Sequence, residues 1–378
     1  MNSRFVLAFS TLVGTIVGAG IFGLPYVISK SGIIPGIFYF VVLGGVVLLL
    51  HLMFGEIALR TKEKHRLIGY ASLYLGKWAK KLVTVSTIVG MVGALLAYII
   101  IAGDFLEIIF SSFLPFSSFV YSLLFWAFFS LFILRGIQTI AKMEFLLSLA
   151  LFLVIFGVFL FAIPKVHLEN FVLFDAAHIF LPYGVVLFAF AGWAAIPEVA
   201  ELFKNRKEKG NLDNLIWWAF VPCGALYALF TFFVIGVSGP QTSQDALSGL
   251  TPFLGNHVVI LGALFGMIAL ATSFLVLGNY LKNSLRYDHK VSDAVAAGIA
   301  LGTPLLLFLV GFREFIAVMG VVGAFIGVFE GVVIVLIYQK ARQKSMREPE
   351  YRVQVPRFLI LLLVIMLILG AILEIVAQ

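Results

Sequence analysis

The feature that most constrains the fold of this chain is a series of long runs of uncharged, mostly apolar residues. Such runs cover 5–29, 31–55, 82–103, 108–134, 145–164, 176–197, 214–244, 246–281 and 294–312. Two further runs, 315–339 and 358–378, are interrupted only by Glu330 and Glu374. A bilayer core roughly 30 Å thick needs about 20 apolar residues for each helix. The runs therefore predict an all-α integral membrane protein with 11 transmembrane helices, forming a single transmembrane domain over 1–378.

The composition excludes a soluble protein. Hydrophobic residues make up 62% of the chain and charged residues 12%, and the mean hydropathy is +1.10, far from the values of a soluble domain. A transmembrane β-barrel is excluded because its strands are alternating segments of about 10 residues.

The first run continues to Ile28, beyond the length of a signal-peptide core, so it predicts a retained span. The single cysteine, Cys223, gives neither a disulfide framework nor a cysteine metal site.

The distribution of basic residues predicts the orientation in the membrane. If the N-terminus is cytoplasmic, all 26 Lys and Arg residues fall in cytoplasmic segments except Lys30, Lys165 and Arg313. Such a bias decides the topology of membrane proteins, and it places the C-terminus on the outside. The net charge of +7 is explained by loops that face anionic lipid and indicates no nucleic-acid partner. Short loops and short termini favour the inner (cytoplasmic) membrane of a prokaryote.

Two loop segments are expected to contain short helices. Between Arg60 and Lys81, apolar residues recur at close to helical spacing beside several lysines, which predicts an interfacial helix on the cytoplasmic leaflet. The longest outer loop covers 237–254. Its Gly, Pro and Ser content predicts irregular backbone with a short helix after Asp245.

Two runs contain residues that weaken a helix at its centre. The segment GTIVGAGIFGLP, 14–25, carries four glycines and a proline, and FAFAGWAAIPEV, 188–199, repeats its Ala-Gly-x4-Pro pattern at an offset of 172 residues. Glycine costs about 1 kcal/mol in a helix interior and proline about 3 kcal/mol. Breaks are therefore predicted in the first and sixth spans. The same offset relates the starts of the fifth and tenth runs.

The offset indicates that a unit of five spans occurs twice. Because five is an odd number, the second copy enters the membrane from the opposite side. The first five-helix repeat is predicted over 5–164, the second, inverted repeat over 176–339, and an accessory eleventh helix over 357–376. Backbone groups freed by a break in hydrocarbon are tolerated only where they face protein, water or a ligand. Two matching breaks therefore indicate a binding site, although small residues also serve tight helix packing.

The chemistry of the freed backbone predicts the ligand. N–H groups at the start of a half-helix carry partial positive charge and bind anions. Carbonyl groups at the end of the preceding half-helix suit an ammonium group or a sodium ion. A molecule with a carboxylate and an ammonium group on neighbouring atoms, an amino acid, fits both. Glycine also lets the backbone approach a ligand closely because it has no Cβ.

The motifs GTIVGAGIFGLP and FAFAGWAAIPEVAEL, with GEIALRT and LGKWAKK, resemble those of the amino acid-polyamine-organocation superfamily, and most closely its amino acid/auxin permease branch. The resemblance covers nearly the whole chain. It implies the LeuT-type fold, in which two inverted sets of five helices have helices 1 and 6 broken, with one accessory helix here. The implied function is secondary active transport of amino acids by alternating access, as symport with sodium or protons. An amino acid/polyamine exchanger without ion coupling and a transporter-like nutrient sensor stay open.

The same resemblance implies roles for residues at the two breaks. Backbone N–H groups are expected to bind the substrate carboxylate at Gly18, Ala19, Gly20 and Ile21. Backbone carbonyls are expected to accept from the amino group at Ile16, Phe188 and Ala191, next to Gly192. The side-chain pocket is expected to be lined by Phe22, Phe190 and Trp193, although aromatic residues in a membrane core often serve packing alone.

The coupling ion is left open by the sequence. In sodium-coupled relatives an ion lies between the broken first helix and hydroxyl groups of the eighth, where this chain has Thr272 and Ser273. Oxygen ligands suit such a cation, but hydroxyl groups in helices also bond to their own backbone. Gly14 stands where some branch members have Asn, which weakens the sodium hypothesis. The fifth span lacks the lysine of some proton-coupled relatives, which weakens the proton hypothesis.

Two carboxylates are further candidates for ion coupling. Glu198 follows the break in the sixth span, and Glu330 lies midway along the tenth. Intramembrane carboxylates are costly and are therefore functional candidates. Glu198 alternatively reaches the cytoplasmic surface with Glu201 and Lys204, and Glu330 alternatively has a structural partner. No cofactor is expected beyond the coupling ion, sodium or a proton.

Other functional classes have no support in the sequence. The six histidines are scattered without metal-ligand spacing and without a recognisable nucleophile and base, so the chain is not expected to be an enzyme. It also lacks the repeated filter or charged ring of an ion channel. The expected partners are an amino acid substrate and the lipid bilayer, with no nucleic acid and no predicted oligomeric state.

Overall fold

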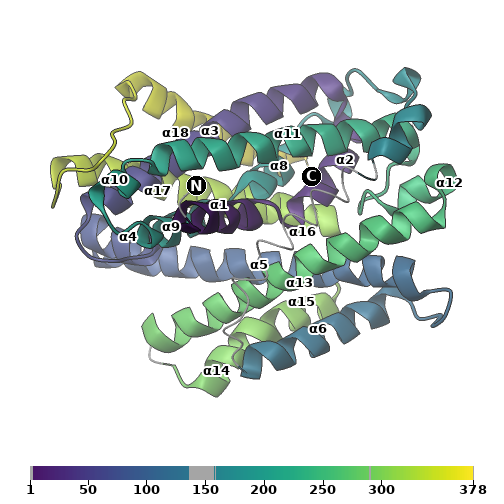
Figure 1. Ribbon diagram of the computed structural model, residues 1–378, viewed down its shortest axis with the longest axis horizontal. Coiled ribbons are helices and arrows are strands. Elements are labelled where there is room, and N and C mark those ends of the chain that lie inside the picture. Colours follow the sequence, from purple (N-terminus) through teal and green to yellow (C-terminus); the bar gives the residue numbers. More distant parts are fainter. Residues whose placement is uncertain (1–2, 136–156, 158, 289–290, 378) are drawn as a thin grey trace.

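The protein is described by a computed structural model that covers residues 3–135, 157, 159–288 and 291–377 (Figure 1). Within these residues every regular element is a helix, which confirms the all-α class. Nine of the described helices are long and apolar enough to cross a membrane, and the bent pair at the start of the chain makes a tenth. The fifth predicted span, 145–164, lies largely outside the described residues.

The membrane-crossing helices follow the order of the predicted runs. They are α1 (Ser3–Ile16) with α2 (Gly20–Ser31), α3 (Ile33–Arg60), α5 (Lys77–Phe110), α6 (Ser118–Arg135), α8 (Pro182–Phe190) with α9 (Ile196–Leu202), α11 (Leu212–Ser238), α13 (Asn256–Asp288), α14 (Asp293–Ala297) with α15 (Thr303–Val310), α16 (Phe315–Val321) with α17 (Val328–Gln343), and α18 (Arg357–Ala377). Two π-helices lie inside the ninth and tenth spans, η7 (Gly298–Gly302) and η8 (Val322–Gly327). Shorter helices lie in the connections, α4 (Leu67–Leu75), α10 (Arg206–Lys209) and α12 (Thr251–Leu254).

The first and sixth spans are interrupted at the predicted places. α1 ends at Ile16, α2 begins at Gly20, and the two helix axes are bent by 44°. α8 ends at Phe190, and the chain passes through the 3-10 turn η4 (Trp193–Ala195) into α9. Both breaks fall on the segments with the Ala-Gly pair, where glycine reduces the gain from continuing the helix. The prediction of two broken spans is confirmed.

The helices form two groups with α1 and α2 between them. α5 packs against α6, α13 and α15, which lie in the lower half of Figure 1. α3 packs against α8, α9 and α11, and α3 and α11 run along the upper half of the view. η8 contacts both α5 and α8. The two breaks therefore lie in the interior of the molecule, where the groups meet.

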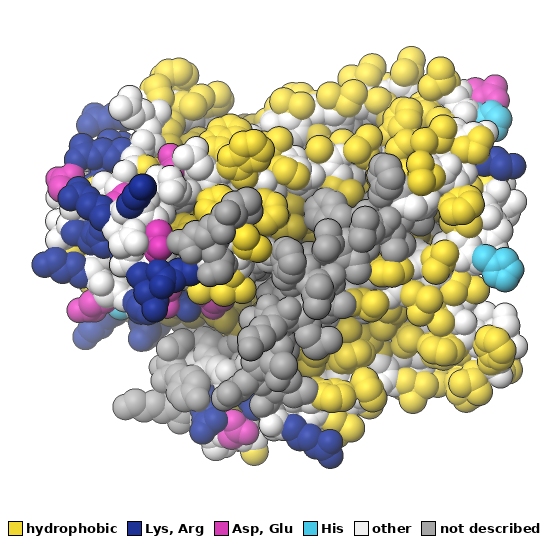
Figure 2. Space-filling model, viewed as in Figure 1, with side chains coloured by type: hydrophobic (Ala, Val, Ile, Leu, Met, Phe, Trp, Pro, Cys, Tyr) yellow, Lys and Arg dark blue, Asp and Glu magenta, His cyan; other side chains and the backbone are white. Residues whose placement is uncertain are grey.

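The sides of the molecule are apolar and one end is basic. Large hydrophobic side chains are exposed along the sides, among them Ile37, Val41, Phe128 and Leu361. Figure 2 shows hydrophobic side chains over the middle of the molecule and most Lys and Arg side chains gathered at one end. An apolar belt of this extent is stable against lipid rather than water. The surface is that of a multi-pass membrane protein.

The loop helices expected from the sequence are present. α4 lies between Arg60 and Lys81, and its buried residues face α5 and α17. Its apolar face is thus covered largely by protein, which differs from the expected interfacial helix on lipid. In the loop over 237–254, the 3-10 turn η6 (Ser248–Leu250) and α12 follow Asp245.

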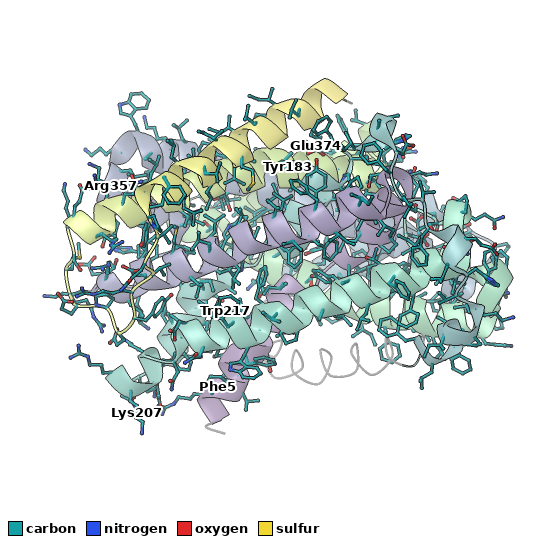
Figure 3. The ribbon with its side chains drawn as sticks, turned by 90° about the horizontal axis from the view of Figure 1, so that it is seen from above. Phe5, Tyr183, Lys207, Trp217, Arg357 and Glu374 are labelled. Carbon is teal, nitrogen blue, oxygen red and sulfur yellow. The ribbon has the colours of Figure 1, made fainter. Side chains whose placement is uncertain are left out.

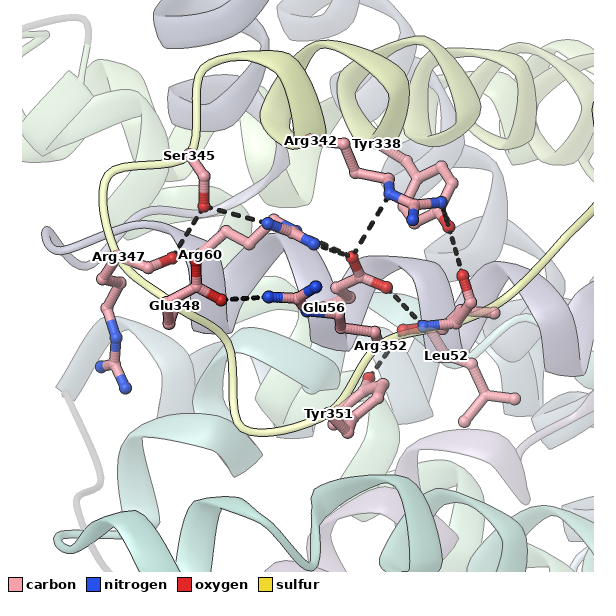
Figure 4. A network of polar contacts seen from close by, with 11 residues as sticks. Leu52, Glu56, Arg60, Tyr338, Arg342, Ser345, Arg347, Glu348, Tyr351 and Arg352 are labelled. Atoms are coloured by element: carbon pink, nitrogen blue, oxygen red, sulfur yellow. Dashed lines mark hydrogen bonds and ion pairs between the residues drawn. The ribbon is translucent and has the colours of Figure 1, made fainter.

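A buried ion pair fixes the segment that leads to α18 (Figure 4). Glu56 of α3 is fully buried, and Arg60 approaches its Oε1 with two nitrogens, each at 2.7 Å. The backbone N–H of Val353 donates to Glu56 Oε2 at 2.6 Å. The Tyr351 hydroxyl donates to the Leu52 carbonyl at 2.6 Å. These bonds hold the segment after α17 against α3.

The accessory helix α18 is attached to α8 (Figure 3). The Tyr183 hydroxyl donates to the Leu367 carbonyl at 2.6 Å. The Glu374 carboxylate accepts from the backbone N–H of Gly184, in the first turn of α8. A carboxylate at this end of a helix is favoured by the helix dipole. α18 therefore supports α8, the first half of the broken sixth span.

Candidate functional site

A cavity of about 170 Å³ lies where the two broken spans meet. Its wall is formed by the end of α1, the first break, the end of α8 and the second break, together with parts of α5, α13, η8 and α17. One water needs roughly 15 Å³ of such volume, so the cavity has room for about a dozen non-hydrogen atoms. That is the size of an amino acid with a large side chain.

Most of the substrate-site residues predicted at the breaks line this cavity. They are Ile16, Gly18, Ala19, Gly20, Phe188, Ala191, Gly192 and Trp193. Ile21, Phe22 and Phe190 do not contribute to its wall. The ring of Phe22 packs edge-on against Phe105 at 4.8 Å, and the ring of Phe190 stacks on Phe220 at 5.1 Å. In this structure the two phenylalanines fill the space between helices instead of the expected side-chain pocket.

The first break offers backbone donors to the cavity. Ala19 precedes α2 and makes no side-chain cap, and the first N–H groups of a helix have no partner within it. Because Ala19 and Gly20 line the cavity, an anionic group placed there meets these donors and the positive end of the helix dipole. The geometry suits a carboxylate.

Tyr227 of α11 ties the two breaks together, a role that was not anticipated from the sequence. Its buried hydroxyl lies 2.7 Å from the Ile16 carbonyl and 3.1 Å from the Ala189 carbonyl. One hydroxyl therefore bridges the ends of α1 and α8. The Ile16 carbonyl, expected to accept from the substrate, also accepts from the backbone N–H of Gly18 at 3.1 Å, so both of its lone pairs have protein partners. The Gly18 N–H, expected to bind the substrate carboxylate, is used in the same bond.

Glycine allows the two broken spans to touch. A Cβ on Gly20 would lie 2.8 Å from the Ala189 Cβ, and a Cβ on Gly192 would lie 2.5 Å from Ile16 Cγ1. Such distances are shorter than carbon atoms tolerate. Gly20 and Gly192 therefore serve tight helix packing where the two broken spans cross, which is the alternative raised from the sequence. The same close crossing brings the freed backbone groups of the two breaks together.

Glu330 lines the cavity from α17. Its Oε2 accepts from the Trp193 indole at 2.7 Å, and its Oε1 accepts from the Thr87 hydroxyl at 3.1 Å. Gly323 and Gly327 of η8 also line the cavity. π-helices are frequent at functional sites, but a π-turn leaves no clear pattern in an apolar sequence.

The hydroxyl pair proposed for sodium lies on α13, outside the cavity wall. The Thr272 hydroxyl donates to carbonyls of its own helix, at 3.2 Å to Ile268 and 2.9 Å to Ala269. Ser273 faces Tyr98, a tyrosine of α5 that lines the cavity and was not anticipated. A hydroxyl that bonds back to its helix is the ordinary behaviour of threonine in membrane helices.

Glu198 lies at the surface rather than in the cavity. Its side chain is 44% exposed and lies 3.4 Å from Arg66, which also pairs with Glu201 at 2.6 Å. Lys64 pairs with Glu201 at 3.2 Å. This arrangement agrees with the alternative raised from the sequence, in which Glu198 reaches the surface with Glu201.

The sequence pattern of the tryptophan/tyrosine permease family matches residues 1–374. The chain belongs to the tryptophan/tyrosine permease family. This permease is therefore an amino acid transporter of the amino acid-polyamine-organocation type and not an enzyme. The matched family differs from the amino acid/auxin permease branch that the motifs most resembled.

Known proteins similar to this permease are transporters. It is 29% identical to "Tyrosine-specific transport system 1" of Haemophilus influenzae, over 96% of this chain and 94% of that protein. It is 22% identical to "Glutamine transporter 2" of Aliivibrio fischeri, over 92% of each. The solved structure of MhsT in complex with L-phenylalanine aligns with a TM-score of 0.66 at 16% identity, over 100% of this chain and 98% of that one. This likeness shows the LeuT-type fold.

Proposed function

We propose that this permease carries aromatic amino acids across the inner membrane by alternating access, coupled to the movement of sodium or protons. The observation that carries the proposal is the cavity between the two breaks, which is lined by Ala19 and Gly20 at the uncapped start of α2. The backbone N–H groups there bind the carboxylate of the amino acid. The carbonyls around the second break accept from its amino group.

The rest of the wall favours an aromatic side chain. Met91, Ala94, Val322 and Ile326 present apolar surface to the cavity. An apolar side chain gains from leaving water roughly in proportion to the area that it buries. Glutamine, named in one relative, needs partners for its amide in the same space. Preference for an aromatic substrate agrees with the family and with the names of the tyrosine-specific and phenylalanine-bound proteins.

The orientation follows from charge. In the proposed arrangement the basic end seen in Figure 2 faces the cytoplasm, as the distribution of Lys and Arg favours. The repeats over 5–164 and 176–339 then enter the membrane from opposite sides, with helix breaks at Gly18 and Gly192. The N-terminus is cytoplasmic and the C-terminus is outside.

Uptake into proteoliposomes tests the proposal. Counterflow of labelled tyrosine, tryptophan, phenylalanine and glutamine is measured first, and then accumulation under imposed sodium or pH gradients. We expect counterflow of the aromatic amino acids and weak competition by glutamine. The absence of counterflow for all of these amino acids would contradict transport and would instead be the behaviour of a nutrient sensor. Counterflow without any response to either gradient identifies an exchanger.

A matched pair of variants locates the site. Gly327 lines the cavity, and a Cβ there makes only ordinary contacts, the nearest at 3.6 Å to Leu187. Gly327→Leu is therefore expected to fill the cavity and abolish counterflow. Gly45 of α3 has open space beside it, so Gly45→Leu should transport normally. Equal activity of the two variants would place the substrate elsewhere.

A further inference from the structure

We infer that Glu330 is the proton-binding group through which this permease couples amino acid transport to a pH gradient. The inference rests on the proposed function and selects the proton as the coupling ion. Glu330 lies in the first turn of α17, directly after the π-helix η8, and is 9% exposed. It is the one carboxylate among the described residues that line the cavity.

The partners of Glu330 are neutral. The Trp193 indole and the Thr87 hydroxyl donate to its two oxygens, and no Lys, Arg or His of the described part of the chain forms an ion pair with it. A charge at this depth is costly without a counter-charge. The carboxyl group is therefore stable in two conditions, as a neutral acid when the cavity excludes water or as a carboxylate when water reaches it.

Trp193 connects the protonation of Glu330 to the broken sixth span. Trp193 begins η4, directly after the break at Ala191 and Gly192. An N–H bond to a charged carboxylate is roughly twice as strong as one to a neutral acceptor. Binding of a proton to Glu330 therefore weakens the contact that holds η4 against α17. The same event changes the wall of the substrate cavity, since both side chains belong to it.

Other titratable groups near α17 do not occupy the same position. His51 of α3 packs edge-on against Trp193 at 6.1 Å, its Nδ1 bonds the Val47 carbonyl, and its Nε2 has no partner among the described residues. Arg60 and Arg342 both pair with Glu56 at the basic end. α4 has no charged residue, and Glu374 of α18 bonds to α8. From α5, Thr87 donates to Glu330, and the Tyr98 phenol lines the same cavity and bonds to Ser273.

The proton step is a simple binding and release. With the cavity open to the outside, a carboxylate oxygen of Glu330 forms an O–H bond with a proton taken from water, and the amino acid occupies the cavity. With the cavity open to the cytoplasm, the amino acid leaves and the O–H bond breaks, so the proton passes to water. No group is oxidised or reduced, and one proton moves with each substrate.

The test compares accumulation with counterflow in proteoliposomes. For the wild type, an outside pH lower by one unit supports about tenfold accumulation of tyrosine by a one-to-one symporter, and added tyrosine acidifies the lumen, as read with a trapped pH dye. Glu330→Gln keeps a similar shape and can still accept from Trp193. We expect it to lose both the accumulation and the acidification, while its counterflow is reduced much less.

Two variants serve as controls. Glu374→Gln changes a buried carboxylate that lies outside the cavity, and His51→Gln changes the other titratable group beside Trp193. Both are expected to keep tyrosine-dependent acidification. If His51→Gln abolishes acidification and Glu330→Gln retains it, the inference is overturned in favour of His51.

The remaining outcomes separate this inference from the proposed function. A wild type with counterflow that responds to sodium but not to pH overturns the role of Glu330 and leaves transport intact. A wild type without counterflow contradicts transport itself. A folded Glu330→Gln that loses counterflow as completely as accumulation shows that Glu330 binds the substrate, which also overturns the inference. If Glu330→Gln does not fold, Glu330→Asp is measured instead. A pH dependence of uptake equal to that of the wild type would then overturn the inference.

Discussion

At the residue scale, the glycines of the two breaks serve the contact between helices as much as the approach of a ligand. Gly20 lies against Ala189, and Gly192 lies against Ile16, at distances that exclude a Cβ. The close crossing is what brings the two broken spans to one cavity. The Tyr227 hydroxyl lies within hydrogen-bond distance of a carbonyl from each span and shares its one O–H between them, which fixes the crossing. Small residues and one hydroxyl thus assemble the site.

Gly20→Ala tests the crossing. The added methyl group overpacks the contact with Ala189, which typically costs about 1–3 kcal/mol. We expect a lower melting temperature in detergent and strongly reduced uptake. Gly45→Ala, with open space around the new Cβ, is the control and should resemble the wild type. A Gly20→Ala protein with wild-type stability and uptake would show that the two spans are not in close contact.

Tyr227→Phe tests the bridge between the breaks. Hydrogen bonds inside membrane proteins contribute about 0.6 kcal/mol on average, and the single O–H of Tyr227 is shared between two carbonyls, so its loss is expected to cost about 0.6 kcal/mol. A loss of that size lowers the apparent affinity for substrate about threefold, as measured by competition in counterflow. Tyr26→Phe, at a half-buried position of α2, is the matched control. Unchanged affinity in Tyr227→Phe would show that the hydroxyl bridge does not contribute to substrate binding.

At the element scale, the helices that surround the cavity are held from outside it. α18 supports the start of α8 through Tyr183 and Glu374. At the basic end, Glu56 and Arg60 of α3 hold the segment after α17. A buried ion pair adds little net stability while both partners are present, but the loss of one partner leaves an unpaired buried charge. These attachments therefore control stability more than substrate binding.

Glu56→Ala is expected to be strongly destabilising. It leaves Arg60, whose side chain is 7% exposed, without its carboxylate, and the expected loss is about 3–5 kcal/mol. Thermal unfolding in detergent measures it. Glu348→Ala removes a carboxylate that pairs with Arg352 at the surface, and an exposed pair contributes about 1 kcal/mol or less. Similar melting temperatures for the two variants would contradict the importance of the buried pair.

At the scale of the whole molecule, the apolar belt and the basic end are the features expected to orient the protein in the bilayer. Figure 3 places Lys207 and Arg357 at the same end, as expected if both are cytoplasmic. Glu169 lies in the connection that precedes α8, which the proposed topology places outside. Cys223 is fully buried, so the native chain provides a low background for labelling of introduced cysteines.

Cysteine labelling tests the orientation. An impermeant maleimide added to spheroplasts is expected to label Glu169→Cys and not Lys207→Cys, since only the first faces outward in the proposed topology. In inverted membrane vesicles the pattern should reverse. The wild type, with Cys223 alone, is the control. Labelling of Lys207→Cys in intact spheroplasts would show that the basic end faces outward, which contradicts the proposed orientation and exchanges the two sides of the transport cycle.

The parts of the site that were predictable are those with a local cause. Glycine and proline change the stability of a helix where they stand, so the breaks near Gly18 and Gly192 could be found from one sequence. The contacts of Tyr98 and Tyr227 could not, because every face of such a span is apolar and no periodicity shows which side faces the cavity. Phe22 and Phe190 were misplaced for the same reason.

By itself, the sequence determined that the chain is a helical membrane protein, where its spans lie, and which two of them are broken, because hydrocarbon forces long uncharged runs to form helices and local chemistry interrupts them. Only the tertiary structure decided which helix faces meet. The rotation of each helix about its axis depends on packing against neighbours that are distant in sequence. That rotation places Tyr227 over both breaks and brings Glu330 to Trp193.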